Sequence, residues 1–205
     1  MLHRIYHWVL KSVFKNAIWQ LASKANGKEV YLTFDDGPHP EITPWVIDQL
    51  ANYQAKATFF CIGKNAQKYP EVLTKIRDNG HAIGHHTQNH VHGWKTSIAD
   101  YKNEVLAASE KIQTTLFRPP YGKLSWAQYR WVSKGYKLIM WSILSRDYDK
   151  KKSPAYCVNR VLNRVKSGDI IVFHDSEKAQ KNLYGALPKI LGELQQRGFQ
   201  FKVIK

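Results

Sequence analysis

Short apolar runs alternate with amphipathic segments along this chain, and this alternation limits the folds open to it. We expect strands at residues 29–32, 56–62, 81–85, 116–118, 136–142, 169–174 and 199–204. Helical periodicity and cap signals predict helices at residues 41–53, 69–80, 97–115, 125–133, 154–166 and 178–197. Strict strand–helix alternation predicts an α/β protein with a parallel sheet, either a doubly wound layer or a barrel.

The chain has 205 residues, a length that fits one domain. No repeat, low-complexity tract or linker interrupts the alternation. We therefore predict a catalytic domain at residues 29–205, preceded by a separate segment at residues 1–28. The two cysteines, Cys61 and Cys157, lie far apart and have no metal-type spacing, and Cys61 ends an apolar run that predicts a buried thiol.

The segment before the first strand has the pattern of a basic amphipathic helix. Its cations recur at helical spacing, at Arg4, His7, Lys11 and Lys15. The longest apolar run, residues 8–10, is too short for a signal-peptide core or a membrane span. We favour a helix that packs across the base of the domain, and the alternative is a helix lying on anionic lipid. With no cleavable signal evident, we expect a cytoplasmic or peripherally membrane-associated protein. No oligomeric state follows from the sequence, and a monomer fits.

The formal net charge is +15 and the sequence pI about 9.8, which favours an anionic partner or surface. Nucleic acid is not expected, because no basic-aromatic recognition motif accompanies the charge. There is no P-loop, no G-x-G-x-x-G and no G-x-S-x-G elbow. These absences disfavour nucleotide enzymes and serine hydrolases.

Two adjacent carboxylates, Asp35 and Asp36, follow the first strand and precede Gly37-Pro38. If both are ionised they repel, so one pKa rises unless a cation lies between or beside them. Active sites of parallel α/β folds form at the carboxyl ends of strands. Other titratable residues follow other strands at His85–His92, Arg118, Asp147 with Asp149, and His174 with Asp175.

His86 and His90 have the i, i+4 spacing that places two imidazoles on one face of a helical turn. With a carboxylate from the first strand they predict a three-ligand metal site with open positions. Zn²⁺ suits this set, Co²⁺, Ni²⁺ or Mn²⁺ could also bind, and non-haem iron oxygenases use the same ligand types. His85 and His92 compete for the ligand role, although a continuing strand would point His85 elsewhere.

The ordered motifs resemble the polysaccharide deacetylases, the NodB-homology family or carbohydrate esterase family 4. The matches are Thr33-Phe34-Asp35-Asp36, His86-Thr87-Gln88-Asn89-His90, Arg118-Pro119-Pro120-Tyr121 and Val172-Phe173-His174. They cover most of the chain, from about residue 29 to residue 204. The resemblance implies a distorted (β/α)7-type barrel, similar to a TIM barrel, that removes N-acetyl groups from amino sugars of a glycan.

The resemblance also implies residue roles. Asp36, His86 and His90 would hold a divalent metal ion, Zn²⁺ above others. Asp35 would act as general base and pair with Arg118, and the backbone N–H of Tyr121 would stabilise the oxyanion. His174 would act as general acid, its pKa raised by Asp147.

The fourth motif of the family, D-x-x-D-W, is only partly kept. It stands here as Leu144-Ser145-Arg146-Asp147-Tyr148, so the first aspartate is leucine and the tryptophan is tyrosine. Asp149 could replace Asp147 if this loop is re-registered. The alternative function is a catalytically silent carbohydrate- or envelope-binding protein on the same barrel. The sequence does not distinguish peptidoglycan from chitin-like oligomers as the substrate.

Overall fold

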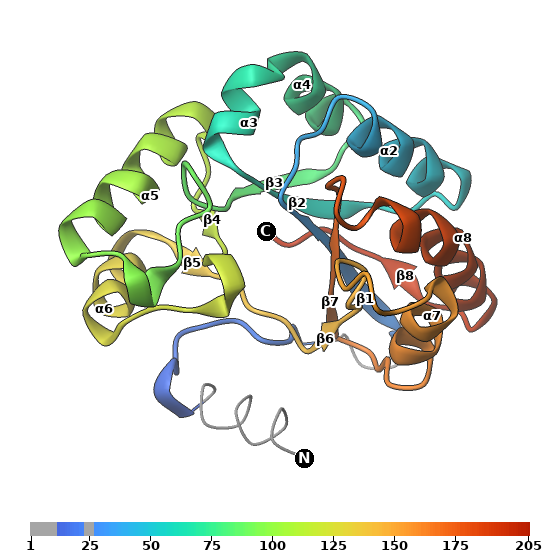
Figure 1. Cartoon of the computed structure of the whole chain (residues 1–205). Coiled ribbons are helices and arrows are strands. Elements are labelled where there is room, and N and C mark those ends of the chain that lie inside the picture. Colours follow the sequence, from blue (N-terminus) through green and yellow to red (C-terminus); the bar gives the residue numbers. More distant parts are fainter. Residues whose placement is uncertain (1–11, 23–26) are drawn as a thin grey trace.

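In the computed structural model, residues 12–22 and 27–205 are described, and their sheet curls around the middle of the molecule with the helices outside it (Figure 1). The strands are β1 (Glu29–Asp35), β2 (Ala57–Cys61), β3 (Ala82–His85), β4 (Leu116–Phe117), β5 (Lys137–Leu138), β6 (Ile143–Leu144), β7 (Ile170–His174) and β8 (Gln200–Phe201). The order is β5-β4-β3-β2-β1-β7-β6, with β8 paired to the start of β1 and all pairs parallel. The predicted parallel α/β barrel is confirmed.

The α-helices lie between strands, as expected from the alternation. They are α2 (Ile42–Asn52), α3 (Gly63–Lys68), α4 (Pro70–Asp78), α5 (Ile98–Ile112), α6 (Trp126–Gly135), α7 (Pro154–Leu162) and α8 (Gln180–Gln196). Two 3-10 turns, η1 (Gly93–Lys95) and η2 (Pro120–Gly122), lie in loops that follow strands. The largest core cluster packs α2, α4, α7 and α8 against β1, β2 and β7.

Local signals explain several helix boundaries. Ser97 caps α5 by accepting a hydrogen bond from the Asp100 backbone N–H, and Ser125 with Gln128 forms a capping box at α6. The helix predicted to reach residue 115 ends at Ile112 instead, because Gln113 adopts a left-handed conformation with φ of 52°. The cap chemistry is local, so the sequence alone predicts it.

Two predictions about elements were wrong. The strand expected at residues 136–142 ends at Leu138, and β6 is a separate strand that pairs with β7. Helix α3 was not predicted. Its six residues carry too few apolar positions to show a period. The expected buried thiol was correct, since Cys61 and Cys157 are both free and buried.

The amphipathic helix predicted before the first strand does not extend through the described part of that segment. Ser12 and Val13 are helical, but Ile18 bridges Ile139, just after the edge strand β5, and Gln20 bridges Asp169, just before β7. The chain passes there as the blue segment of Figure 1. Residues 1–11 lie outside the described residues, and with them most of the expected helix and its contact with the base or with lipid. The division at residue 28 stays a prediction.

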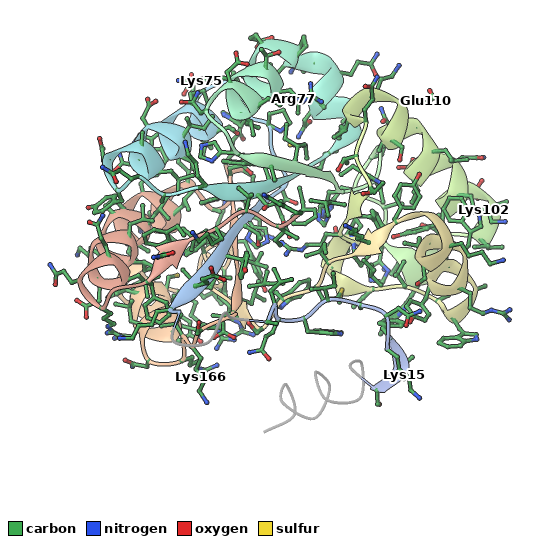
Figure 2. All side chains as sticks on the ribbon, turned by 180° about the vertical axis from the view of Figure 1, so that it is seen from behind. Lys15, Lys75, Arg77, Lys102, Glu110 and Lys166 are labelled. Carbon is green, nitrogen blue, oxygen red and sulfur yellow. The ribbon has the colours of Figure 1, made fainter. Side chains whose placement is uncertain are left out.

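None of the described helices combines the length and the apolar character that crossing a bilayer requires. The cations labelled in Figure 2 come from separate parts of the outer surface. Lys75 and Arg77 lie on α4, Lys102 lies on α5, and Lys15 and Lys166 lie in loops. Basic residues therefore lie on several sides of the barrel.

Candidate active site

The register of β1 and β7 brings two predicted proton carriers side by side. Asp35 and His174 are direct partners across these parallel strands, and each is the last residue of its strand. Both side chains line one cavity of about 440 Å³. The pairing depends on non-local register, since the two residues are far apart in the chain.

Arg118 reaches Asp35 from the other side of the curled sheet. It follows β4, which is separated from β1 by β3 and β2. Its Nη1 donates to Asp35 Oδ1 at 2.6 Å and to Thr33 Oγ1 at 2.8 Å. Its Nε and Nη2 donate to the carbonyls of Ile139 and Met140 at 3.2 and 3.0 Å. The guanidinium is thus fully buried yet bonded on several sides.

The pairing with Arg118 does not fully offset the burial of Asp35. Burial raises the pKa of the Asp35 carboxyl, the Arg118 and His174 charges oppose this, and the balance stays above the ordinary value. A carboxylate with a raised pKa is the stronger base once it is ionised.

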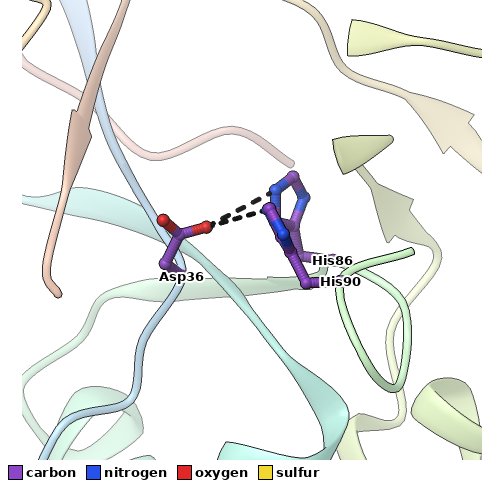
Figure 3. Close-up of side chains that lie close together, drawn as sticks. All are labelled: Asp36, His86 and His90. Carbon is purple, nitrogen blue, oxygen red and sulfur yellow. Dashed lines mark ion pairs between the residues drawn. The ribbon is translucent and has the colours of Figure 1, made fainter. Parts of the chain in front are cut away.

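Asp36, His86 and His90 meet at the candidate metal centre (Figure 3). Their ligand atoms all lie within 4.8 Å of one another, with Asp36 Oδ1 3.2 Å from His90 Nε2 and 3.9 Å from His86 Nε2. His86 Nδ1 lies 2.7 Å from the Arg118 carbonyl, which assigns the proton to Nδ1 and leaves the Nε2 lone pair toward Asp36. The residues therefore fit a divalent ion with nitrogen and oxygen ligands.

The charges of this trio also suit metal binding. Burial and the neighbouring His90 lower the pKa of His86 well below its usual value, so its imidazole is neutral, the form that coordinates. Burial would raise the pKa of Asp36, but the hydrogen bond from His90 and the charge of His174 outweigh it and hold that pKa below its ordinary range. Asp36 is therefore ionised at neutral pH.

Asp147, and not Asp149, holds His174. Asp147 Oδ1 lies 2.8 Å from His174 Nδ1, and Oδ2 accepts the His174 backbone N–H at 2.7 Å. Burial lowers the pKa of His174, but the charge and hydrogen bond of Asp147, together with the Asp36 and Asp35 charges, outweigh this and raise it to about 9. The imidazole is thus a cation at neutral pH, as a general acid requires. Asp149 instead accepts at its backbone carbonyl from Asn182 and at its side chain from the Lys151 backbone.

The two altered positions of the fourth motif both line the cavity. Leu144 lies at the end of β6, and the Tyr148 ring makes an edge contact with His174 at 4.9 Å between centroids. Lys178 lies over the Tyr148 ring at 5.4 Å and also lines the cavity. The substitutions therefore change the cavity wall, whereas the Asp147–His174 contact remains.

Backbone strain gathers at the motif loops. Among the described residues other than glycine, seven have positive φ, and five of these follow the strands that carry the site: Asp36, Thr87, His90, Tyr121 and Arg146. Such conformations are costly for non-glycine residues and persist where surrounding contacts impose them. At Asp36 and His90 the positive φ accompanies the convergence of the candidate metal-ligand side chains.

Sequence reasoning noted Asp175 but gave it no role. Its carboxylate is buried and accepts from the Gly37 backbone N–H at 3.1 Å and from Thr43 Oγ1 at 2.5 Å. Burial, partly opposed by the Thr43 hydrogen bond, raises its pKa to about 7. Asp175 thereby ties the loop after Asp36 to β7. The sequence signal was its position next to His174 at a strand end.

The two competing histidines lie outside the metal centre. His85 is fully buried and packs against Phe117 and Tyr136, and burial lowers its pKa to about 3. His92 contacts the rings of Tyr121 and Trp94. Within residues 12–22 and 27–205, the one group of three or more ligand side chains close enough to share an ion is Asp36, His86 and His90.

A parallel α/β barrel with two histidines, one aspartate and a candidate acid–base pair at one rim fits a metal-dependent hydrolase. Residues 22–138 match the family model described as polysaccharide deacetylase. The chain belongs to the polysaccharide deacetylase family, and it is a deacetylase of that family. The family depends on a metal in general, which agrees with the candidate centre.

Named relatives cover nearly the whole chain. It is 35% identical over 194 residues to a peptidoglycan-N-acetylglucosamine deacetylase of Bacillus cereus, covering 91% of this chain and 90% of the relative. It is 33% identical over 193 residues to a chitooligosaccharide deacetylase of Azorhizobium caulinodans, covering 85% and 91%. The crystal structure of a peptidoglycan N-acetylglucosamine deacetylase in complex with 4-naphthalen-1-yl-N-oxidanyl-benzamide superposes with a TM-score of 0.86. It is 31% identical, and 94% of each chain is covered.

Proposed function

We propose that this protein hydrolyses the N-acetyl group of N-acetylglucosamine residues in peptidoglycan, with Zn²⁺ as the native ion. The observation that carries the proposal is the placement of Asp35 and His174 beside the Asp36–His86–His90 trio in one cavity. Two relatives of similar length are named as a peptidoglycan-N-acetylglucosamine deacetylase and a chitooligosaccharide deacetylase. We favour peptidoglycan as the substrate because the sequence identity to the first relative is higher.

The roles of the side chains follow from their contacts. Asp36, His86 and His90 would hold a divalent ion, which would supply Lewis-acid polarisation of the acetyl carbonyl and activation of a water molecule. Asp35 receives the proton of the attacking water while Arg118 holds its Oδ1 in place. The backbone N–H of Tyr121, at the rim of the cavity, stabilises the developing oxyanion.

His174 completes the reaction by donating a proton to the leaving amine as the carbon–nitrogen bond breaks. Acetate and a free amino sugar are the products. Asp147 fixes the imidazole through Nδ1, which leaves Nε2 as the donating atom. The raised pKa of His174 keeps this proton available at neutral pH.

Acetate release from peptidoglycan and from N-acetylglucosamine oligomers, with and without a chelator, tests the proposal. We expect release that stops on chelation and returns on addition of Zn²⁺, and turnover reduced on the order of 10²–10⁴-fold in Asp35→Asn and His174→Ala. Release that persists in the metal-free protein would contradict the metal assignment. No acetate from any acetylated glycan would favour the silent carbohydrate-binding alternative, and faster release from chitin-like oligomers would replace the proposed substrate.

A further inference from the structure

A row of aromatic rings leads away from the metal centre over the protein surface. The centroid of the metal-ligand ring of His90 lies 4.8 Å from that of Tyr121, and Tyr121 lies 5.2 Å from His92. His92 lies 6.1 Å from Trp94. The rings come from the loop after β3 and from η1 and η2, so two separate loops build one continuous row.

The two largest rings of the row are strongly exposed. Tyr121 is 56% and Trp94 is 53% exposed, although large apolar side chains are usually buried. Tyr121 also lines the cavity that holds Asp35 and His174. The exposed row is thus continuous with the cavity in which the acetyl group is proposed to react.

The exposure of Trp94 does not come from a loose loop. Its indole Nε1 donates to the Leu124 carbonyl at 2.9 Å, and Gln128 Nε2 donates to the carbonyls of Gly93 and Thr96 at 2.9 and 3.0 Å. Gly93 is packed so closely that an added Cβ would lie 2.1 Å from the Lys123 carbonyl oxygen. The ring is therefore held in place before any ligand arrives, which lowers the entropy cost of binding to it.

The chemistry of this row suits a sugar ring. The C–H faces of a pyranose are apolar and pack against aromatic faces, while its hydroxyls stay in water. The Lys123 ammonium lies 4.8 Å from the centroid of the Trp94 ring and can also pair with an acidic substituent on a sugar. A rigid, exposed aromatic ring beside a cation, connected to the cavity residue Tyr121 through His92, marks a binding surface for an extended glycan.

We propose that Trp94 and Lys123 form an additional sugar-binding subsite, which takes a sugar residue of the same glycan chain beyond the one that enters the metal cavity. The inference rests on the proposed function for the identity of the glycan. The subsite makes binding depend on the length of the glycan, because oligomers long enough to reach Trp94 bind better than short ones.

The kinetic test compares a dimer and a hexamer of N-acetylglucosamine with wild-type protein and Trp94→Ala. We expect kcat/KM for the hexamer to fall on the order of tenfold in the variant, through KM. The loss should shrink for the dimer, because the proposal places Trp94 beyond the sugars that a dimer supplies. Trp126→Ala is the matched control, because Trp126 is equally exposed at 56% but lies outside the row. Equal losses for dimer and hexamer, or none for either, would overturn the proposal.

A binding measurement separates this inference from the proposed function. In protein labelled with 5-fluorotryptophan, the Trp94 resonance, identified through Trp94→Phe, is expected to shift on titration with the hexamer and not with the dimer. This readout needs no turnover and uses the unaltered chain, so it stands even if Trp94→Ala does not fold. A shift without acetate release would retain the subsite and reject the activity. A Trp94 resonance that the hexamer leaves unmoved would reject the subsite.

Discussion

Replacing Asp147 with asparagine tests whether a buried carboxylate keeps His174 protonated. Asp147 is the largest cause that raises the pKa of His174, from 6.5 to about 9, against a burial effect that lowers it. Asparagine removes the Asp147 charge and leaves the burial together with the smaller Asp36 and Asp35 effects, so we expect that pKa to fall to about its ordinary value of 6.5. At pH 8 the protonated fraction would drop from about 90% to about 3%, a loss of about 30-fold in the active form.

The assay is the pH profile of kcat/KM for acetate release, between about pH 5 and pH 10. The sign follows from the role of His174 as an acid. Activity requires the imidazolium, so the alkaline limb should lie near pH 9 in the wild type and move to lower pH in Asp147→Asn. The variant should therefore lose much more activity at pH 8 than at pH 6. The metal content is measured at each pH so that metal loss is not read as His174 titration.

The other contacts of Asp147 provide the alternative that the profile must exclude. Asp147 also accepts from Ser145 Oγ and from the Tyr148 backbone N–H, so asparagine could disturb the loop itself. A disturbed loop would reduce activity by a similar factor at every pH, and that result would refute the electrostatic reasoning. Asp149→Asn is the matched control, because its carboxylate does not contact His174, and its profile should follow the wild type.

Two further predictions concern stability at the site. Arg118→Met leaves Asp35 buried without its partner and should lower the free energy of unfolding, measured in urea, by about 3–5 kcal/mol. The double variant Arg118→Met with Asp35→Asn should recover part of this loss. A change below about 1 kcal/mol in the single variant would show that the pair is not structurally important. Gly37→Ala places a Cβ 2.1 Å from Asp175 Oδ2 and should lower the free energy of unfolding by about 1–3 kcal/mol and also reduce activity. Gly135→Ala is the control, because no atom lies within 4 Å of the added Cβ, and it should be neutral or stabilise the protein by up to about 1 kcal/mol. Equal melting temperatures for the two variants would contradict the close packing of Gly37 on Asp175.

The sequence by itself determined the alternation of elements and the chemistry available at the strand ends. The apolar run before Asp35 and Asp36 is a local pattern that can be read without the fold. The serine caps of α5 and α6 are of the same kind. The ordered motifs, from Thr33-Phe34-Asp35-Asp36 to Val172-Phe173-His174, likewise indicate the family from the sequence alone. The i, i+4 spacing of His86 and His90 indicated the right pair of residues, but the helical turn expected from it was wrong. Residues 86–90 are not helical, and Thr87 and His90 have positive φ.

The tertiary structure decided which of these groups meet. The register of β1 on β7 places Asp35 opposite His174, and the curl of the sheet brings Arg118 across from β4. Neither register nor curl is encoded near those residues, because both arise from packing summed over the whole barrel. Tertiary packing also decided that Asp147, and not Asp149, contacts His174, and that residues 18–21 follow an extended path. Strand β6 could not be predicted either, because its two residues are too few to show a period.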